Sequence, residues 1–247
     1  MTSRFLTALP VFNEVKSVCQ VLDEVSQYSD DILVVDDGST DGTLELLRQR
    51  KDIILLEHDE NRGYGGALIS AFDYAVEHNY EVVVTIDCDG QHEPQRIRQF
   101  VSALAETNAD VISGSRYLKA FAGDTIPPEE RRAINVQVTR LLNERLGYKL
   151  TDAFCGFKAY RVAAVSKLVL QENGYAMPLE LWVQAWCQDL KVVELAVPLI
   201  YLDEERSFGS NLNDPETRLK YYQDVLARSF KALPVDCPKR RLGEQVG

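Results

Sequence analysis

A short apolar run that ends in two carboxylates constrains this chain more than any other feature. Residues 82–91 read V-V-V-T-I-D-C-D-G-Q. Val82 to Ile86 form a run of the length and composition of a buried strand, and a strand apolar on both faces is typical of a parallel sheet covered by helices. Ligands bind at the carboxyl ends of the strands in such sheets. The sequence therefore predicts an α/β fold with Asp87 and Asp89 at its functional edge.

The spacing of these two acids suggests a metal site. Carboxylate oxygens are hard ligands that suit Mg²⁺ or Mn²⁺, and Mg²⁺ is usually held by one or two carboxylates together with substrate phosphates. One interpretation of Asp87 and Asp89 is therefore a metal–diphosphate site. The other is a polar exit from the strand, because two acids at this spacing often occur by chance. This stretch alone leaves both interpretations open.

Alternating strand and helix patterns surround the central run. Further strands are predicted at Phe5–Leu9, Ile32–Val35, Ile53–Leu56 and Asp110–Ile112. Between them, apolar residues recur at the spacing of amphipathic helices. Such alternation implies a mostly parallel sheet, flanked by helices and joined by right-handed crossovers.

The second half of the chain is less regular. Residues 120–128 contain one glycine and two prolines and are predicted to form a loop. Helices are predicted over 129–146, from Arg161 to about Glu172, from Pro178 and over 215–231, with a late strand over 192–200. We assign Trp182 and Trp186 to the core rather than to a surface for stacking sugars.

A glycine-rich stretch, E-N-R-G-Y-G-G-A, begins at Glu60 and precedes a predicted helix. Glycine-rich loops at helix N-termini can bind phosphate. However, the stretch has neither the P-loop spacing nor the dinucleotide-binding spacing. We therefore assign its glycines to close packing of loop against helix, with phosphate binding as the alternative.

The charge and cysteine content narrow the classes of partner. A net charge of −11 over 247 residues argues against a nucleic-acid partner and against strong adhesion to anionic lipid. The five cysteines show no C-x-x-C spacing, and the N-terminus is unlike a signal peptide. No apolar run approaches the roughly 18 residues of a membrane span. We expect a cytoplasmic protein with reduced thiols and no transmembrane segment; peripheral contact with a membrane stays open.

Taken in order, the motifs resemble those of the family 2 glycosyltransferases, which have the GT-A fold. The shared motifs are P-V-F-N-E, V-V-D-D-G-S-T-D-G-T, N-R-G-Y-G-G-A and I-D-C-D-G-Q-H-E-P. Four later motifs resemble the dolichol-phosphate mannose synthase branch: S-G-S-R-Y, T-D-A-F-C-G-F-K-A-Y-R, G-Y-A-M-P-L-E-L and the Arg206 loop. The resemblance covers Leu6 to about Asn211. It implies one catalytic domain over 1–235, with a nucleotide-sugar half to about residue 118, an acceptor half from about 119 to 235, and a tail over 236–247.

The resemblance implies a nucleotide-diphosphate sugar donor of the GDP-mannose or UDP-glucose type. The residues that would bind it are Pro10, Phe12, Glu14, Val35, Asp37, Asp87, Cys88 and Arg116. Asp87 and Asp89 would hold the diphosphate through Mg²⁺ or Mn²⁺, with Gln91 as a further ligand. Phe12 stands where the family usually has Tyr, so a stacking ring is kept and a hydroxyl is lost.

On the acceptor side, the resemblance assigns phosphate or acceptor contacts to Arg116 and Arg206. Asp152 and Lys158 lie in the motif that frames this side. Lys158 stands where Arg is common, which is not a neutral change for bidentate phosphate contact. The branch usually places a Lys shortly after the loop glycine, whereas Gly209 is followed by S-N-L.

The implied activity is inverting, metal-dependent transfer of a sugar to a polyprenyl or dolichyl phosphate. The catalytic candidates are Asp89, Asp152, Glu180 and Arg206. A phosphate acceptor is already anionic, whereas a hydroxyl acceptor needs a general base, for which we name Asp152 and Glu180. For Glu180, a helix-surface or capping role is an equal alternative. A soluble hydroxyl acceptor, a nucleotidyltransferase and a non-catalytic nucleotide-sugar-binding protein stay open as alternatives, and the sequence predicts no oligomeric state.

Overall fold

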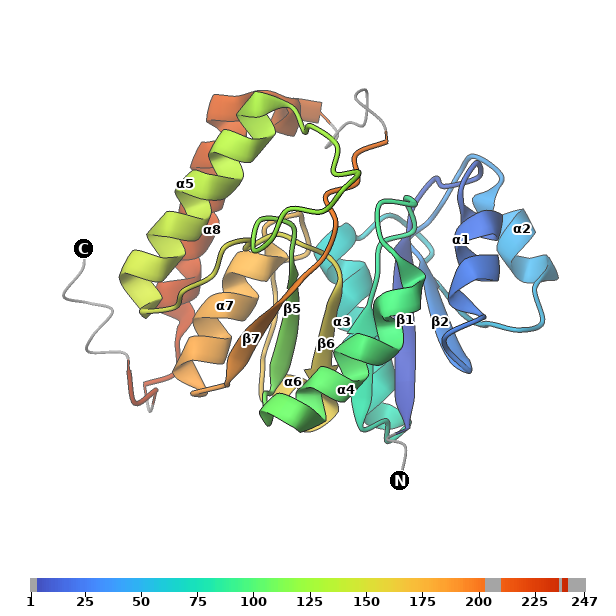
Figure 1. The fold of residues 1–247 in the computed structure, drawn as a ribbon, viewed down its shortest axis with the longest axis horizontal. Coiled ribbons are helices and arrows are strands. Elements are labelled where there is room, and N and C mark those ends of the chain that lie inside the picture. Colours follow the sequence, from blue (N-terminus) through green and yellow to red (C-terminus); the bar gives the residue numbers. More distant parts are fainter. Residues whose placement is uncertain (1–3, 203–209, 236, 240–247) are drawn as a thin grey trace.

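The fold is a single α/β domain built on one mixed sheet with helices on both faces (Figure 1). The structure is a computed structural model that describes residues 4–202, 210–235 and 237–239. The strands are β1 Phe5–Val11, β2 Asp31–Asp36, β3 Ile54–Glu57, β4 Val82–Thr85, β5 Val111–Ser115, β6 Lys158–Arg161 and β7 Val192–Ala196. The helices are α1 Val18–Val25, α2 Thr43–Gln49, α3 Tyr64–Glu77, α4 Ile97–Thr107, α5 Glu129–Leu146, α6 Val162–Val165, α7 Met177–Cys187 and α8 Pro215–Ala232. Two short 3-10 helices, η1 and η2, span Pro94–Arg96 and Ser210–Asn213.

The strands lie in the order β3-β2-β1-β4-β6-β5-β7. All pairings are parallel except those of β6, which runs antiparallel to both β4 and β5. One core cluster joins the sheet to α3, α5, α7 and α8, and a second joins its other face to α1, α2 and α4. Every residue of β4 is buried. The predicted mostly parallel α/β fold is thereby confirmed.

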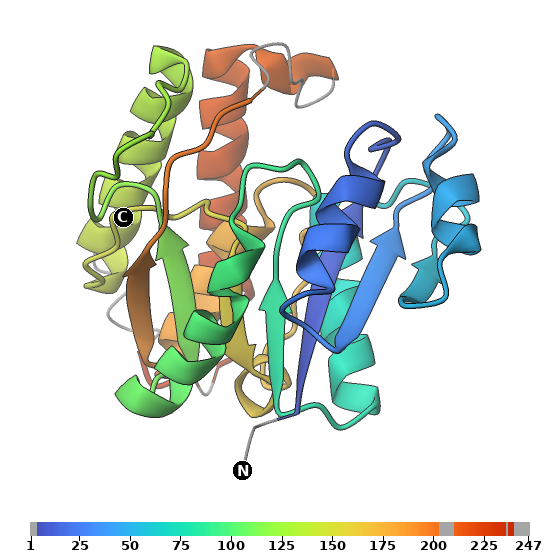
Figure 2. The same cartoon turned by 45° about the vertical axis from the view of Figure 1, so that its right-hand side comes forward.

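Helices α5 and α8 pack against each other and, with α7, form one end of the molecule. Figure 2 shows this pair standing apart from α1 and α2, which lie at the opposite end of the sheet. The helix predicted over 129–146 is confirmed as α5, and Trp182 and Trp186 are buried as expected. Strands β6 and β7 complete the sheet that the first half begins, so the proposed boundary near residue 118 does not separate two sheets.

Three local predictions are wrong. The stretch before Arg161 forms the unpredicted strand β6, and the helix expected from Arg161 to about Glu172 ends at Val165. Beyond α6, the backbone N–H groups of Gln171 and Glu172 donate to the Glu180 carboxylate instead of to helix carbonyls. The late strand stops at Ala196 rather than Ile200, where Pro198 lacks an N–H group to donate.

The cysteines also depart from expectation. The structure joins Cys187, the last residue of α7, to Cys237 by a disulfide, with their Cα atoms 5.6 Å apart. The expectation that all five thiols are reduced is therefore wrong for this pair. Their sequence separation of 50 residues gave no local signal. Within the described ranges, no helix combines the length and apolar character needed to cross a membrane.

We predict that Trp182 anchors the loop before β6 to the core. Its buried indole N–H donates a 3.0 Å hydrogen bond to the carbonyl of Ala153. Trp182→Phe should lower the free energy of unfolding by about 2–4 kcal/mol, because it leaves a buried carbonyl unpaired and a void beside it. Urea unfolding measures this change.

The control is Trp186→Phe. The Trp186 ring packs edge-on against Phe230 near the C-terminal end of the same helix. This substitution should have a clearly smaller effect. Equal losses for the two variants would show that ring volume, not the Ala153 hydrogen bond, sets the cost.

Candidate active site

A cavity of about 900 Å³ opens at the carboxyl ends of the parallel strands. Its walls come from the segments that follow β1, β4 and β5 and from the facing parts of α3, α5, α7 and α8. The predicted site residues that line it are Pro10, Phe12, Glu14, Asp37, Asp87, Cys88, Asp89, Gln91 and Arg116. Ligands are expected at this edge of an open α/β sheet. The chain thus brings together most of the residues that sequence motifs singled out.

Asp87 lies just beyond β4 and is held from three directions. The Tyr64 hydroxyl donates a 3.0 Å hydrogen bond to Asp87 Oδ1, and Nε2 of His92 lies 3.1 Å from Oδ2. Behind the carboxylate, a Cβ atom added to Gly156 would lie 2.6 Å from Asp87 Cγ, so a side chain there would displace the acid. Burial and the nearby Asp87 charge raise the pKa of Tyr64 well above its ordinary value, which keeps the phenol protonated as a donor.

The acids after β4 form a set of oxygen donors that fits Mg²⁺ or Mn²⁺. Asp89 Oδ1 accepts the backbone N–H of Gln91 at 2.9 Å, across a turn in which Gly90 has a φ of 74°. A carboxylate offers about four lone-pair sites, so these hydrogen bonds are compatible with a ligand role. No cluster of three or more His, Cys, Asp or Glu side chains suited to a metal occurs in the described part of the chain. The arrangement therefore suits an ion that takes its other ligands from water and a diphosphate.

Asp37 supports the loop after β3. Its carboxylate accepts the backbone N–H groups of Arg62 and Gly63 at 2.9 and 2.8 Å. It also lies 2.7 Å from Nδ1 of His58, whose Nε2 is 2.9 Å from the Ser70 hydroxyl. This Asp–His–Ser chain has the order of a catalytic triad, but His58 is buried and neither His58 nor Ser70 lines the cavity. Its geometry favours a supporting role.

The glycine-rich stretch is a packing device, as predicted. A Cβ atom at Gly65 would lie 2.7 Å from Cβ of Met177, and one at Gly63 would overlap the carbonyl of Asn173. The Gly66 N–H donates to that same carbonyl at 3.1 Å. Val35 is fully buried within β2 and does not line the cavity.

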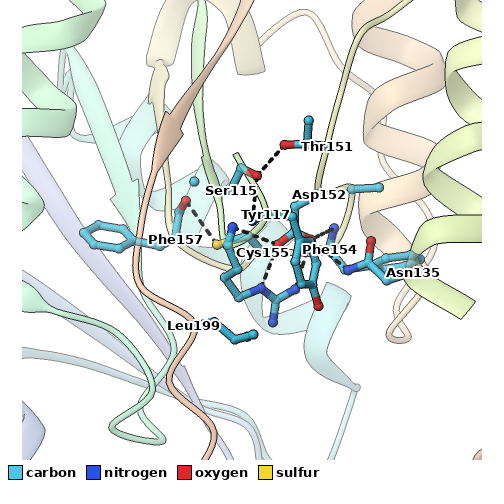
Figure 3. A network of polar contacts seen from close by, with 12 residues as sticks. Ser115, Tyr117, Asn135, Thr151, Asp152, Phe154, Cys155, Phe157 and Leu199 are labelled. Carbon is cyan, nitrogen blue, oxygen red and sulfur yellow. Dashed lines mark hydrogen bonds and ion pairs between the residues drawn. The ribbon is translucent and has the colours of Figure 1, made fainter. Parts of the chain in front are cut away.

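Arg116 and Asp152 form a bidentate ion pair. Figure 3 shows Asp152 in this polar network, with Asn135 beside it. Arg116 Nε and Nη2 donate to Asp152 at 2.6 and 3.0 Å, and the Asn135 amide donates to it at 2.8 Å. Burial favours the neutral acid, but the Arg116 charge and these hydrogen bonds outweigh it and lower the pKa of Asp152 to about 2. The Asp152 side chain is 0% exposed, whereas that of Arg116 is 24% exposed. This geometry favours Asp152 as a support for Arg116 over Asp152 as a general base.

The other acceptor-side predictions fall in different places. Glu180 is buried and its Oε2 accepts the N–H groups of Gln171 and Glu172 at 2.8 and 2.7 Å, which matches the alternative of a structural role. Lys158 is also buried, and its ammonium donates to the Cys155 carbonyl. Burial lowers the pKa of Lys158. Arg206 lies outside the described residues.

Several cavity residues were missed from sequence. The principal ones are Tyr64 on α3, Arg131 and Asn135 on α5, and Arg218 on α8. Glutamate and arginine repeat at the start of α5, so the pattern does not reveal which of these side chains faces inward. Together with Arg116, two further arginines thus line the cavity of an acidic protein.

Comparisons with known proteins identify the family of this chain. Residues 7–169 match the family described as Glycosyl transferase family 2. The undecaprenyl-phosphate mannosyltransferase of Micrococcus luteus is 29% identical over 212 residues, covering 82% of this chain and 85% of that protein. The polyprenol monophosphomannose synthase of Mycolicibacterium smegmatis is 29% identical over 229 residues, covering 86% and 84%.

Solved structures share the fold. The glucosyl-3-phosphoglycerate synthase of Mycobacterium tuberculosis superposes with a TM-score of 0.71 at 17% identity, covering 94% of this chain and 82% of that one. That synthase has been crystallised with UDP together with Mn²⁺ or Mg²⁺, and with phosphoglyceric acid. At this identity the likeness shows the fold alone.

We predict that the Asp152 carboxylate stabilises the fold through Arg116. At neutral pH, Asp152→Asn should lower the free energy of unfolding by about 3 kcal/mol, the lower end for breaking a buried pair, because Arg116 keeps some contact with solvent. The folded pKa of Asp152, about 2, lies below the unfolded value, so this stabilisation is present above about pH 4 and is lost as the pH falls toward 2. Denaturant unfolding at several pH values measures it.

The control is Glu144→Gln, which removes an exposed i,i+4 ion pair with Arg140. It should change the stability by no more than about 0.5 kcal/mol. A difference between wild type and Asp152→Asn that stays constant down to pH 2 would contradict the assigned pKa.

Proposed function

Because the chain belongs to glycosyl transferase family 2, on the dolichol-phosphate mannose synthase-like branch, we propose that it is an inverting, metal-dependent enzyme with a polyprenyl phosphate acceptor. The observation that carries the proposal is one cavity with two carboxylates after β4 and the Arg116–Asp152 pair after β5. The first suits a metal–diphosphate group and the second an anionic acceptor. Membership of this family favours glycosyl transfer over nucleotidyl transfer and over non-catalytic binding.

The donor would occupy the side of the cavity formed by β1 and β4. Phe12 presents an exposed ring there that can stack on a nucleobase. Asp87 and Asp89, with Gln91, would hold Mg²⁺ or Mn²⁺ against the diphosphate. When bound, the ion supplies charge neutralisation for the leaving nucleoside diphosphate. The donor is of the GDP-mannose or UDP-glucose type.

The acceptor phosphate would lie at Arg116. A guanidinium has five N–H donors, and Asp152 engages those of Nε and Nη2, so the Nη1 pair remains for an anion. The bidentate pair also fixes the orientation of the guanidinium plane. An acceptor phosphate oxygen would attack the anomeric carbon as the bond to the leaving diphosphate breaks on the opposite face.

The proposed phosphate acceptor is consistent with the placement of the two carboxylates named as candidate bases. Asp152 and Glu180 are both buried and both occupied by hydrogen bonds. An anionic oxygen nucleophile carries no proton that must be removed. It therefore requires neither carboxylate to act as a general base. A hydroxyl acceptor would require a base elsewhere in the cavity.

An apolar rim supports a lipid-linked acceptor. Leu118, Ile126 and Leu202 are exposed, Ile126 by 91%. Each is the chain neighbour of a residue that lines the cavity: Tyr117, Pro127 and Tyr201, respectively. An isoprenoid chain leaving the cavity would meet these side chains. We propose a cytoplasmic protein that contacts the membrane peripherally through this rim.

We predict that donor binding requires the metal and Asp89. Calorimetry with GDP-mannose and UDP-glucose should detect binding with Mn²⁺ for one of them, and addition of EDTA should weaken that binding markedly. Asp89→Ala should weaken binding by at least about 100-fold, the upper end of what loss of an outer-shell partner costs.

The matched control is Asp59→Ala, which removes an exposed acid that does not line the cavity. Its donor affinity should equal that of the wild type. Equal affinities with Mn²⁺ and with EDTA would refute the proposed metal site.

We predict that Arg116 serves the acceptor rather than the donor. Arg116→Lys keeps the charge but loses the fork geometry, so KM for polyprenyl phosphate should rise about tenfold or more, as expected for a lost charged hydrogen bond. The donor dissociation constant should stay unchanged. Arg140→Lys, at an exposed arginine on the outside of α5, is the control.

The same transfer assay should compare polyprenyl phosphate with 3-phosphoglycerate and with a neutral sugar. Polyprenyl phosphate should be the fastest acceptor. Faster transfer to either hydroxyl acceptor would overturn the lipid-phosphate assignment and would call for a general base.

A further inference from the structure

Tyr64 has a contact that the proposed mechanism has not used. It is the first residue of α3, and it lines the cavity beside Asp87. Its hydroxyl donates the 3.0 Å hydrogen bond to Asp87 Oδ1. Its ring stacks on that of Tyr175, with centroids 5.9 Å apart and planes inclined by 15°. A side chain from the glycine-rich stretch thus touches a proposed metal ligand.

The glycines on either side of Tyr64 fix its position. Because Gly63 and Gly65 lack side chains, the start of α3 lies directly against the backbone of residues 172–174. The Gly66 N–H locks this approach by donating to the Asn173 carbonyl. Tyr175 is carried by the segment that follows this contact. The two stacked rings are therefore mounted on two segments whose backbones are in direct contact.

The Asp87 carboxylate has little freedom to turn away from Tyr64. Gly156 brings backbone against its far side, so closely that a Cβ atom there would lie 2.5 Å from Oδ1. His92 lies 3.1 Å from Oδ2. Tyr64→Phe removes the hydrogen bond to Asp87 and keeps both the backbone and the aromatic ring of residue 64. The contacts of Gly156 and His92 offer no such substitution.

We propose that Tyr64 is a positioning residue for the metal site, holding the Asp87 carboxylate in the orientation that receives the metal–diphosphate group. The inference rests on the proposed metal-dependent donor binding. A ligand held in its productive orientation loses little freedom when the ion arrives, so removal of its hydrogen-bond donor weakens metal affinity. Tyr175 supports Tyr64 by fixing the plane of its ring.

The test is Mn²⁺ binding to Tyr64→Phe, followed by electron paramagnetic resonance of free Mn²⁺ with and without GDP or UDP. Phenylalanine keeps the stacked ring and removes only the hydroxyl. We expect the Mn²⁺ dissociation constant in the presence of nucleotide to rise about tenfold, the lower end for loss of an outer-shell partner. Nucleotide affinity measured in EDTA should not change. A purely structural role for Tyr64 would not move the metal affinity selectively.

Tyr74→Phe is the matched control. Tyr74 lies on the same helix, stacks on His78 with centroids 3.8 Å apart, and does not line the cavity. Its Mn²⁺ affinity should equal that of the wild type.

Each other outcome is decisive. One outcome is a wild type that shows nucleotide-dependent Mn²⁺ binding and a Tyr64→Phe variant that binds Mn²⁺ equally tightly. That result overturns the role of Tyr64 and leaves the proposed metal site standing. An equal loss of nucleotide affinity in EDTA would also overturn this role, because the defect would then not lie at the metal. If the wild type itself shows no nucleotide-dependent Mn²⁺ binding, the proposed metal site fails first and the inference falls with it.

Discussion

Strand β6 lies between β4 and β5 and runs against both of them, and the geometry of the site depends on this placement. The segment that leads into β6 must pass the carboxyl ends of its two neighbours. It therefore places Gly156 against Asp87 and Asp152 against Arg116 within one short stretch. A parallel strand in this position would enter from the opposite edge and would bring neither contact. The sides of the cavity that hold Asp87 and Arg116 are thus fixed by the same piece of backbone.

The charges around the cavity are determined by local pairing rather than by net charge. The chain carries −11 overall, yet among the described residues three arginines line the cavity. The Asp152 carboxylate is fully buried, which would be very unfavourable without the bidentate Arg116 contact and the Asn135 amide. The pair gives Arg116 a fixed direction at the edge of the cavity, so an anion that enters meets an oriented donor. A rigid fork of this kind distinguishes this wall of the cavity from an ordinary basic surface.

The sequence predicts the fold well where each element carries its own pattern. The strands that become β1 to β5, the helix over 129–146 and the placement of Asp87 and Asp89 all follow from apolar runs and their ends. Prediction fails where a distant group decides the local structure. The segment after α6 leaves the helical path because Glu180 accepts its N–H groups, and Tyr64 approaches Asp87 only after α3 packs on the sheet. Neither the Cys187–Cys237 pair nor the antiparallel entry of β6 has a local signature.

The burial of two catalytic candidates bears on the proposed reaction. Asp152 and Glu180 are acids in motifs that frame the acceptor, and motif matching therefore makes them candidate bases. The structure directs both inward, one to a guanidinium and the other to two backbone N–H groups. Asp152 and Glu180 are occupied by these structural contacts. Neither is therefore available to accept a proton from an acceptor. The nucleophile that suits this site is one that arrives already deprotonated, and a phosphate monoester at neutral pH has that property. The burial of these two carboxylates thus favours the proposed phosphate acceptor, which requires no proton removal.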